Sequence, residues 1–213
     1  MKIENLNVEY GDKTVFSNFH LEISEGEVTC ILGNSGVGKT TLLEHIASKA
    51  QRENKEVAVA FQEPRLFEHL TVLENLKLIG YSEKEIVRVL EKIGLNKNLH
   101  CYPSQLSGGE RQRANFARAF LSQAELLLLD EPFFSLDLKL KLRLIKLLLE
   151  EKSDKTIVFV THDIYEALML SDRILLLRNG EIALDLKTEA SVENRKYGKL
   201  TQEREILLNA QLI

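Results

Sequence analysis

One segment constrains this chain more than any other: Gly33-Asn34-Ser35-Gly36-Val37-Gly38-Lys39-Thr40, directly after the apolar run Val28–Leu32. Its glycines let the backbone curl so that successive N–H groups converge on one anion. A helix predicted to begin at Lys39 would present its positively polarised end to the same anion. The Lys39 ammonium suits a phosphate and the Thr40 hydroxyl suits Mg²⁺. We therefore predict a phosphate-binding loop between a buried strand and a helix of about ten residues.

Strand patterns lie on both sides of this loop. Residues 2–10 and 15–23 alternate apolar and polar side chains around the turn Gly11-Asp12, which predicts an antiparallel pair. Short apolar runs predict buried strands at 57–61, 126–129, 156–160 and 174–177. A helical pattern at 138–150 separates two of them, and such alternation is typical of a parallel sheet covered by helices. We therefore predict an α/β core with a mostly parallel sheet and an N-terminal antiparallel β layer.

The stretch between residues 62 and 121 has a helical pattern instead. Thr71 with Glu74, and Ser82 with Glu85, match the capping box that begins many helices. A further helix is predicted to begin near Ser107. We expect one domain over residues 1–213. Its predicted parts are a core lobe (1–61 and 122–185), an inserted helical lobe (62–121) and a tail (186–213) whose apolar patch at 206–208 would dock as a short terminal helix.

Charge and hydropathy exclude several classes of protein. The 28 basic and 32 acidic residues are interspersed, with a net charge of −4, so no basic stripe indicates nucleic acid as a partner. No apolar run approaches the roughly 18 residues of a membrane-spanning helix, and the first residues do not resemble a signal peptide. Two cysteines cannot form a disulfide framework. We expect a cytoplasmic protein that would need a partner for any role at a membrane.

A second motif ends the predicted strand at 126–129. Asp130 and Glu131 follow this apolar run and Pro132 stops it. The carboxyl ends of parallel strands meet at the edge where ligands of open α/β sheets bind. Asp130 is therefore suited to hold Mg²⁺ through its water shell. Glu131 is suited to polarise a water for in-line attack on a terminal phosphate.

A third motif is Leu106-Ser107-Gly108-Gly109-Glu110, at the beginning of a predicted helix. Two glycines after a serine could form a second anion-binding helix N-terminus. Taken alone, the motif is equally typical of an ordinary helix cap. A single nucleotide needs only one phosphate cradle, so a second one in the same chain calls for an explanation.

These motifs, in this order with Gln62, Ser135-Leu136-Asp137 and His162, resemble the ABC ATPase family over about residues 1–185. The resemblance implies a P-loop NTPase core of the RecA-like type, with ATP and Mg²⁺ as ligands. It also implies that two copies pair head to tail. The Ser107 segment of one copy would then close over ATP held by the other, which would account for the second cradle.

The resemblance assigns roles residue by residue. The residues implied in catalysis are Glu131, His162, Gln62 and Lys39. The residues implied in nucleotide binding are Tyr10, Gly33, Asn34, Ser35, Gly36, Val37, Gly38, Lys39, Thr40, Thr41, Asp137 and, acting in the opposite copy, Ser107, Gly108, Gly109 and Glu110. The residues implied at Mg²⁺ are Thr40, Gln62 and Asp130. Two alternatives stay open: Tyr10 could be an ordinary strand tyrosine, and Asp137 could cap the helix that follows it.

The chain departs from the family pattern in three places. Glu110 stands where the family usually has glutamine, and we expect Arg111 or Arg113 to neutralise its carboxylate. The pair Phe133-Phe134 is bulkier than the small pair common after the catalytic glutamate. Only 22 residues separate Lys39 from Gln62, about half the usual length, so the antiparallel layer should be trimmed.

The segments 61–67 and 70–75 are similar to the nitrate, sulfonate, taurine and thiamine-precursor uptake group. They imply an ATPase subunit of a bacterial importer, peripheral on the inner face of the membrane. Permease subunits would dock near residues 63–80, although this could be an ordinary amphipathic face, and a solute-binding protein would act indirectly. Two alternatives are an ATPase for lipoprotein extraction or another mechanical task at the membrane, and a soluble ABC ATPase acting on ribosomes or nucleic acid. The balanced charge and the lack of tandem domains oppose the last.

Overall fold

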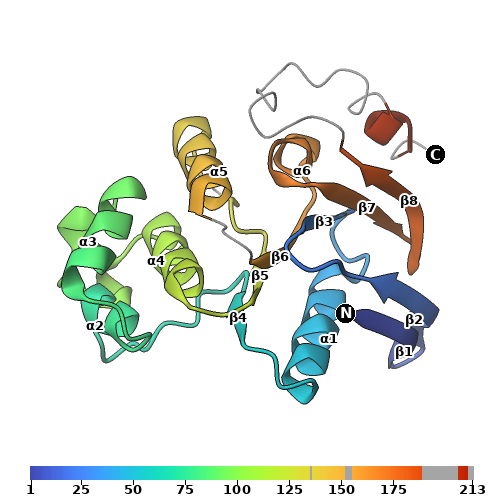
Figure 1. Ribbon diagram of the computed structural model, residues 1–213, viewed down its shortest axis with the longest axis horizontal. Coiled ribbons are helices and arrows are strands. Elements are labelled where there is room, and N and C mark those ends of the chain that lie inside the picture. Colours follow the sequence, from blue (N-terminus) through green and yellow to red (C-terminus); the bar gives the residue numbers. More distant parts are fainter. Residues whose placement is uncertain (135, 152–154, 189–205, 211–213) are drawn as a thin grey trace.

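The central sheet has six strands in the order β4-β5-β6-β3-β7-β8 in the computed structural model, which describes residues 1–134, 136–151, 155–188 and 206–210 (Figure 1). The strands are β3 (Val28–Leu32), β4 (Val57–Ala60), β5 (Leu126–Asp130), β6 (Thr156–Thr161), β7 (Arg173–Arg178) and β8 (Glu181–Lys187). Neighbours from β4 to β7 pair in parallel, and β8 runs antiparallel to β7. The mostly parallel sheet is therefore confirmed.

Strand β8 lies outside the sequence prediction, which ended the strands at residue 177. A tight turn at Asn179-Gly180, with φ of 50° and 77°, reverses the chain after β7. Asn-Gly is the strongest short hairpin signal, since both residues accept positive φ. The strand itself alternates half-buried and exposed residues at the sheet edge, so it lacks the apolar run that revealed the other strands.

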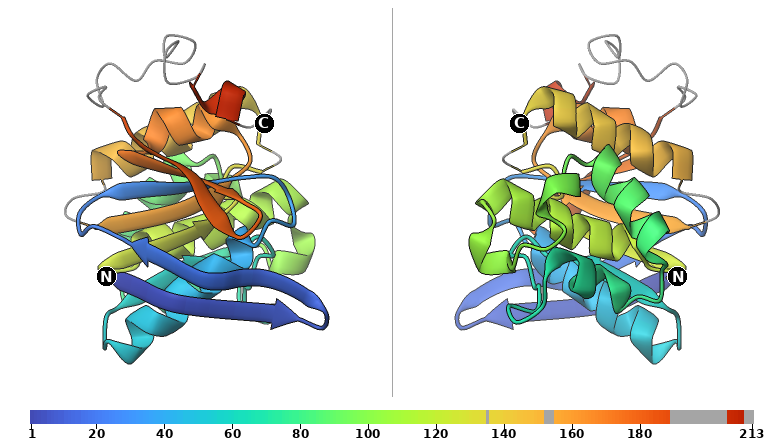
Figure 2. Two further views of the ribbon diagram at one scale, coloured as in Figure 1. Left: turned by 90° about the vertical axis from the view of Figure 1, so that its right-hand side faces the viewer. Right: turned by 90° about the vertical axis from the view of Figure 1, so that its left-hand side faces the viewer.

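The predicted antiparallel pair is confirmed as β1 (Lys2–Tyr10) and β2 (Lys13–Glu22), which turn at Gly11 with φ of 58°. The two strands form a sheet of their own, and Figure 2 shows them in front of the central sheet. Only residues 53–56 connect α1 to β4. The short segment before Gln62 therefore adds no strand to this layer, as expected.

The helices are α1 (Lys39–Arg52), α2 (Val72–Lys77), α3 (Glu83–Lys92), α4 (Gly108–Leu121), α5 (Leu138–Glu151) and α6 (Ile164–Leu170), with short 3₁₀ turns at Asn96–Asn98 and Pro103–Gln105. Helix α1 has 14 residues, more than the ten or so expected. The capping boxes at Thr71 and Ser82 are confirmed. None of the described helices is long and apolar enough to cross a bilayer.

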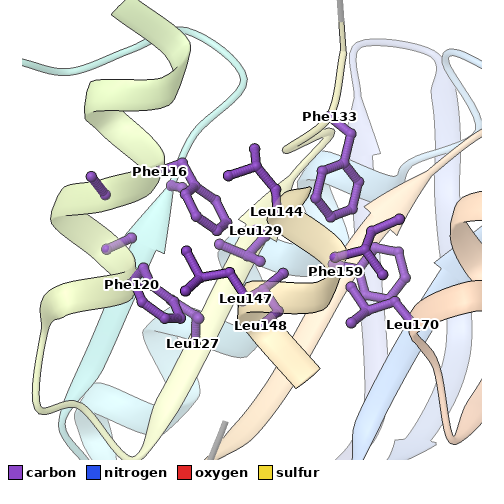
Figure 3. Packing of buried hydrophobic residues seen from close by; sticks show 14 of the residues in the cluster. Phe116, Phe120, Leu127, Leu129, Phe133, Leu144, Leu147, Leu148, Phe159 and Leu170 are labelled. Carbon is purple, nitrogen blue, oxygen red and sulfur yellow. The ribbon is translucent and has the colours of Figure 1, made fainter. Parts of the chain in front are cut away.

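The strands β3, β5, β6 and β7 send alternate side chains into two separate cores. Leu126 and Leu128 face α1 and the hairpin layer, whereas Leu127 and Leu129 face the opposite side. Figure 3 shows this second core, where Phe116 of α4 packs near Leu129 and Leu144 of α5. The architecture therefore has three layers, and both faces of the sheet are covered, as an almost fully apolar parallel sheet requires.

Residues 206–210 form a short helix, as the apolar patch predicted. Leu207 is fully buried in the second core, and Ala210 packs against it. The Arg178 guanidinium donates to the Ala210 carbonyl at 3.3 Å. The docked terminal helix is therefore confirmed for these residues; the rest of the predicted tail beyond residue 188 lies outside the described residues.

Candidate nucleotide-binding and catalytic site

The loop Gly33–Gly38 lies between the end of β3 and the first turn of α1. Close packing explains two of its glycines. A Cβ at Gly33 would lie 2.7 Å from the Leu177 carbonyl oxygen, and one at Gly38 would lie 2.6 Å from a Val15 methyl. Gly38 also has φ of 106°, in the region that favours glycine. Local packing therefore fixes the curled path of the loop before any ligand is considered.

The Lys39 ammonium folds back onto this loop. It donates to the carbonyls of Gly33 at 2.8 Å and Asn34 at 2.9 Å, and it lies 3.8 Å from the Glu131 carboxylate. Burial lowers the pKa of Lys39, while the charges of Glu131 and Asp130 oppose that shift. A phosphate would supply the same kind of negative charge, so this ammonium is placed to exchange loop carbonyls for phosphate oxygens.

Thr40 and Asp130 meet across the sheet edge. The Thr40 hydroxyl donates to Asp130 Oδ2 at 2.8 Å, whereas Asp130 Oδ1 is buried with no hydrogen-bond partner among the described residues. Burial raises the pKa of Asp130, and the Thr40 hydrogen bond and the Lys39 charge only partly offset it. An unpartnered buried carboxylate oxygen beside a hydroxyl is a donor set that suits a hard cation such as Mg²⁺. These residues therefore fit the expected ion.

Glu131 is held in a strained and almost buried position. Its φ of 44° is rare for a residue other than glycine, and its carboxylate lies 3.1 Å from His162 Nδ1. The Lys39 ammonium lies on the same carboxylate. Strain of this kind, at about 1–3 kcal/mol, is typical of functional sites. The sequence motif located Glu131 but contained no sign of its backbone conformation.

The cavity above the loop measures about 310 Å³, near the lower end of the range for small-molecule sites. Its lining brings together sequence-predicted residues from four regions of the chain: Tyr10, Ser35, Gly36, Gly38, Lys39, Thr40, Thr41, Gln62 and Glu131. Lys13 and Val15 of β2 also line it and were not predicted from the sequence. Tyr10 is mostly exposed at this rim, where an aromatic ring is free to stack.

Gln62 follows the end of β4, and a helix of the other lobe fixes the residue before it. The Phe61 carbonyl accepts a hydrogen bond from Asn115 Nδ2 of α4 at 3.0 Å, and Asn115 is fully buried. The helix that begins after Ser107 therefore also anchors the strand end that carries Gln62. No sequence motif pointed to Asn115, because its partner is a backbone carbonyl 54 residues away.

Ser107 is the N-cap of α4, and it forms a full capping box with Glu110. The Glu110 carboxylate accepts from the Ser107 backbone N–H at 2.8 Å and from its hydroxyl at 2.7 Å. Neither residue lines the cavity above the loop. The structure therefore does not bring these two residues to the phosphate loop of the same chain.

The neutralisation expected for Glu110 differs from the arrangement in the structure. Hydrogen bonds from Ser107 are the main cause that lowers the pKa of Glu110, and Asn98 and the charge of Arg113 add less. Arg111 instead donates to the Pro103 carbonyl at 2.8 Å. Of the two arginines expected to neutralise Glu110, Arg113 therefore acts on it to a minor extent, whereas the Arg111 guanidinium is engaged by the Pro103 carbonyl and lies 3.9 Å from the Glu68 carboxylate.

Gly108 and Gly109 differ from the glycines of the phosphate loop. Neither has a positive φ, a Cβ at Gly108 would meet nothing within 4 Å, and one at Gly109 would meet only the Arg113 guanidinium at 3.6 Å. Gly108 is exposed. Nothing within the described chain therefore requires glycine here, which leaves the helix N-terminus open to a group from outside.

Asp137 caps α5, as one of the two alternatives predicted. Its carboxylate accepts from the Leu140 N–H at 3.0 Å, and its side chain is exposed. Ser135, part of the predicted motif, lies outside the described residues. Phe134 and Leu138, on either side, are large apolar side chains that are about half exposed.

Comparison with known proteins identifies the family. The model of the ABC transporter family matches residues 16–134. A similar relative is the aliphatic sulfonates import ATP-binding protein SsuB 1 of Paracoccus denitrificans, which is 42% identical over 86% of this chain and 81% of that protein. SsuB 2 of Streptomyces avermitilis is 37% identical over 99% of this chain and 90% of that protein.

A solved structure supports the same family. A dimeric ATP-binding cassette in a post-hydrolysis state, bound to ADP and Pi, superposes with a TM-score of 0.77 at 28% identity, covering 89% of this chain and 99% of that one. The P-loop NTPase fold and the ATP and Mg²⁺ ligands expected from the motifs are those of this family. The chain therefore belongs to the ABC transporter family, as one of its ATP-hydrolysing subunits.

Proposed function

We propose that this subunit powers a bacterial solute importer as a head-to-tail homodimer docked on permease subunits. One observation carries the pairing: an open, glycine-lined helix N-terminus at Ser107–Gly109 lies outside the cavity of its own chain. A helix N-terminus attracts phosphate, and the ATP bound by a second copy would supply that phosphate. The exposed Phe134 and Leu138 beside Asp137 would give the facing copies an apolar contact.

In the proposed mechanism each chain holds the phosphates of ATP with the N–H groups of Gly33–Gly38 and with Lys39. Thr40, Asp130 and Gln62 would hold Mg²⁺, which when bound neutralises charge on the phosphate oxygens. Glu131 orients a water and accepts its proton, since its carboxylate is the base nearest Lys39. His162 keeps Glu131 aligned through their 3.1 Å contact and would reach the terminal phosphate. Closure over Ser107 of the second copy excludes water.

Residues 63–80 are the proposed permease-docking surface. Phe67 is 48% exposed and Leu78 is 60% exposed, so two large apolar side chains of this segment lie at the surface of the helical lobe. The loop that carries Phe67 is fixed from inside by the fully buried Asn75, whose Oδ1 accepts from the Phe67 N–H at 2.8 Å and whose Nδ2 donates to the Leu70 carbonyl at 3.0 Å. A rigid loop with an exposed aromatic anchor suits a partner groove.

We would test aliphatic sulfonates first as the solute, because the similar relatives are named as aliphatic sulfonates import ATP-binding proteins. A solute-binding protein would deliver the solute to the permease and would touch this subunit only indirectly. Choice of solute would then reside in the permease and the binding protein, since the cavity of this chain is built for phosphate.

Glu131→Gln tests the ATPase assignment. We expect ATP affinity to stay within about threefold of the unchanged chain, turnover to fall at least about a hundredfold, and a nucleotide-bound dimer to accumulate. Equilibrium binding, phosphate release and light scattering after size exclusion measure the three effects. A Glu131→Gln chain that still hydrolyses ATP at the original rate would contradict the proposed mechanism.

Phe67→Asp tests the docking surface. We expect the variant to lose co-purification with permease subunits from detergent-solubilised membranes, while its ATP-dependent dimerisation stays unchanged. Leu208→Asp is the matched control, since Leu208 is another exposed apolar side chain, on the terminal helix away from this surface. Equal permease recovery for both variants would exclude residues 63–80 as the docking site.

A further inference from the structure

A partly buried charge network lies next to His162, and its residues do not line the cavity above the phosphate loop. The Lys141 ammonium, in the first turn of α5, lies 2.5 Å from Glu166 Oε1 and 3.0 Å from Asp163 Oδ2. Glu166 Oε2 accepts from the Thr161 hydroxyl. One lysine therefore joins α5 to two carboxylates and, through Glu166, to the end of β6.

Burial of Glu166 strengthens its interactions with Lys141 and Thr161. Glu166 is 5% exposed, and burial raises its pKa, against the lowering effect of its hydrogen bonds from Lys141 and Thr161. Burial would lower the pKa of Lys141, but the hydrogen bonds and charges of Glu166 and Asp163 outweigh it and raise the value. Removal of the ammonium would leave Glu166 as an uncompensated buried charge.

One end of the network fixes His162. Thr161 directly precedes it, and the Thr161 hydroxyl accepts from the Asp163 N–H at 3.1 Å. The Thr161 carbonyl accepts from the Gly33 N–H at 3.2 Å, at the start of the phosphate loop. The backbone on both sides of His162 is therefore tied down, and His162 in turn contacts Glu131.

The backbone of Lys141 also contacts the residue that caps α5. The Lys141 N–H donates to the Asp137 carbonyl at 2.9 Å, so Lys141 closes the first turn of the helix that Asp137 caps. Asp137 is exposed, on the loop that we propose to face the second copy. The Lys141 backbone is therefore part of the turn that begins at Asp137, while the Lys141 side chain reaches Asp163 and Glu166, on the segment that follows His162.

We propose that Lys141 is a positioning residue, which holds His162 against Glu131 through its ion pairs with Asp163 and Glu166. This inference rests on the proposed roles of Glu131 and His162. It predicts that loss of the Lys141 charge disturbs turnover far more than ATP binding, because the network touches the loop of His162 and leaves the Lys39 contacts in place.

Lys141→Met is the test, with Lys139→Met as its matched control, since Lys139 is an exposed lysine in the same turn. We expect Lys141→Met to lower turnover about tenfold to a hundredfold, with ATP affinity within about threefold. In NMR spectra of the full chain, its His162 ring resonances should shift while those of His45 on α1 stay in place. Lys141→Arg should restore at least about half of the turnover, because it keeps the charge.

The double variant Lys141→Met with Glu166→Gln separates positioning from stability. It removes the Lys141 ammonium together with the buried carboxylate of Glu166, so we expect thermal stability to recover toward that of the unchanged chain while turnover stays low. Recovery of turnover together with stability, or unmoved His162 resonances in Lys141→Met, would overturn the proposal. Failure of the mechanism itself is separate: it would appear as an active Glu131→Gln chain, and the NMR measurement does not depend on activity.

Discussion

The two helix N-termini of this chain use glycine for opposite reasons. At the start of α1, Gly33 and Gly38 are enclosed by Leu177 and Val15, so the loop is completed by its own chain. At the start of α4, Gly108 has no positive φ, and a Cβ there would meet nothing within 4 Å, so neither backbone nor packing within the described chain requires glycine. The first N-terminus is crowded by its own chain, whereas the second is open. This difference is what we expect if the first site forms within one copy and the second is completed by another copy, as proposed.

Gly38→Ala should have the largest effect on this contrast. The methyl group would force a positive-φ backbone and push against Val15, which we expect to destabilise the fold by ~3 kcal/mol and to weaken ATP binding. Chemical denaturation and equilibrium ATP binding measure both effects. A variant with unchanged stability would show that the loop is not fixed by packing.

Gly108→Ala should separate folding from function at the other N-terminus. We expect stability to change by less than about 1 kcal/mol, since alanine fits an exposed helical position at least as well as glycine. Steady-state turnover should nevertheless fall at least about tenfold, because the methyl group would stand between the helix and the phosphate of the second copy. Unaltered turnover would argue against a site shared between copies.

Ser107→Ala should cost about 1 kcal/mol of stability through loss of the cap, and it should also lower turnover. Ser82→Ala is the matched control, because Ser82 forms the same capping box at α3 with Glu85. We expect the control to lose the same stability, measured by thermal or chemical unfolding, and to keep its turnover. Equal activity in the two variants would reduce Ser107 to an ordinary cap.

Glu110→Gln should have the smallest effect. The folded chain lowers the pKa of Glu110, so its contribution to stability is present above the ordinary value of about 4.5 and is lost as the pH falls through the lowered value. Glutamine has no such titration. We therefore expect the stability difference between the two chains to vary with pH only in that acidic range and to be flat near pH 7. A difference that changes near neutral pH would point to another group.

Local motifs made much of this molecule predictable. The phosphate loop, Asp130-Glu131, the capping boxes and the parallel strands each depend on residues that are close in sequence, and the structure contains these elements. Strand β8 was missed although Asn179-Gly180 announced it, because an edge strand has no continuous apolar run.

The Lys141 network and the Asn115 contact could not be predicted. Lys141 and Glu166 are 25 residues apart on different helices, and an isolated lysine in a helix reads as a solvated side chain. The left-handed backbone of Glu131 could not be predicted either, because its φ depends on how the sheet edge packs and not on the residue type. The missing information is tertiary in each case.

The hydrogen bonds of Lys39 to its own loop have a kinetic consequence. Two carbonyls hold the ammonium and packed glycines hold the backbone, so contacts within the chain keep the loop curled. An incoming triphosphate exchanges partners with a preformed receptor, and little backbone entropy is lost on association. We expect encounter with nucleotide to proceed in a single phase at a rate near the ordinary diffusive range, so that in the proposed mechanism the meeting of the two copies would be the slower step.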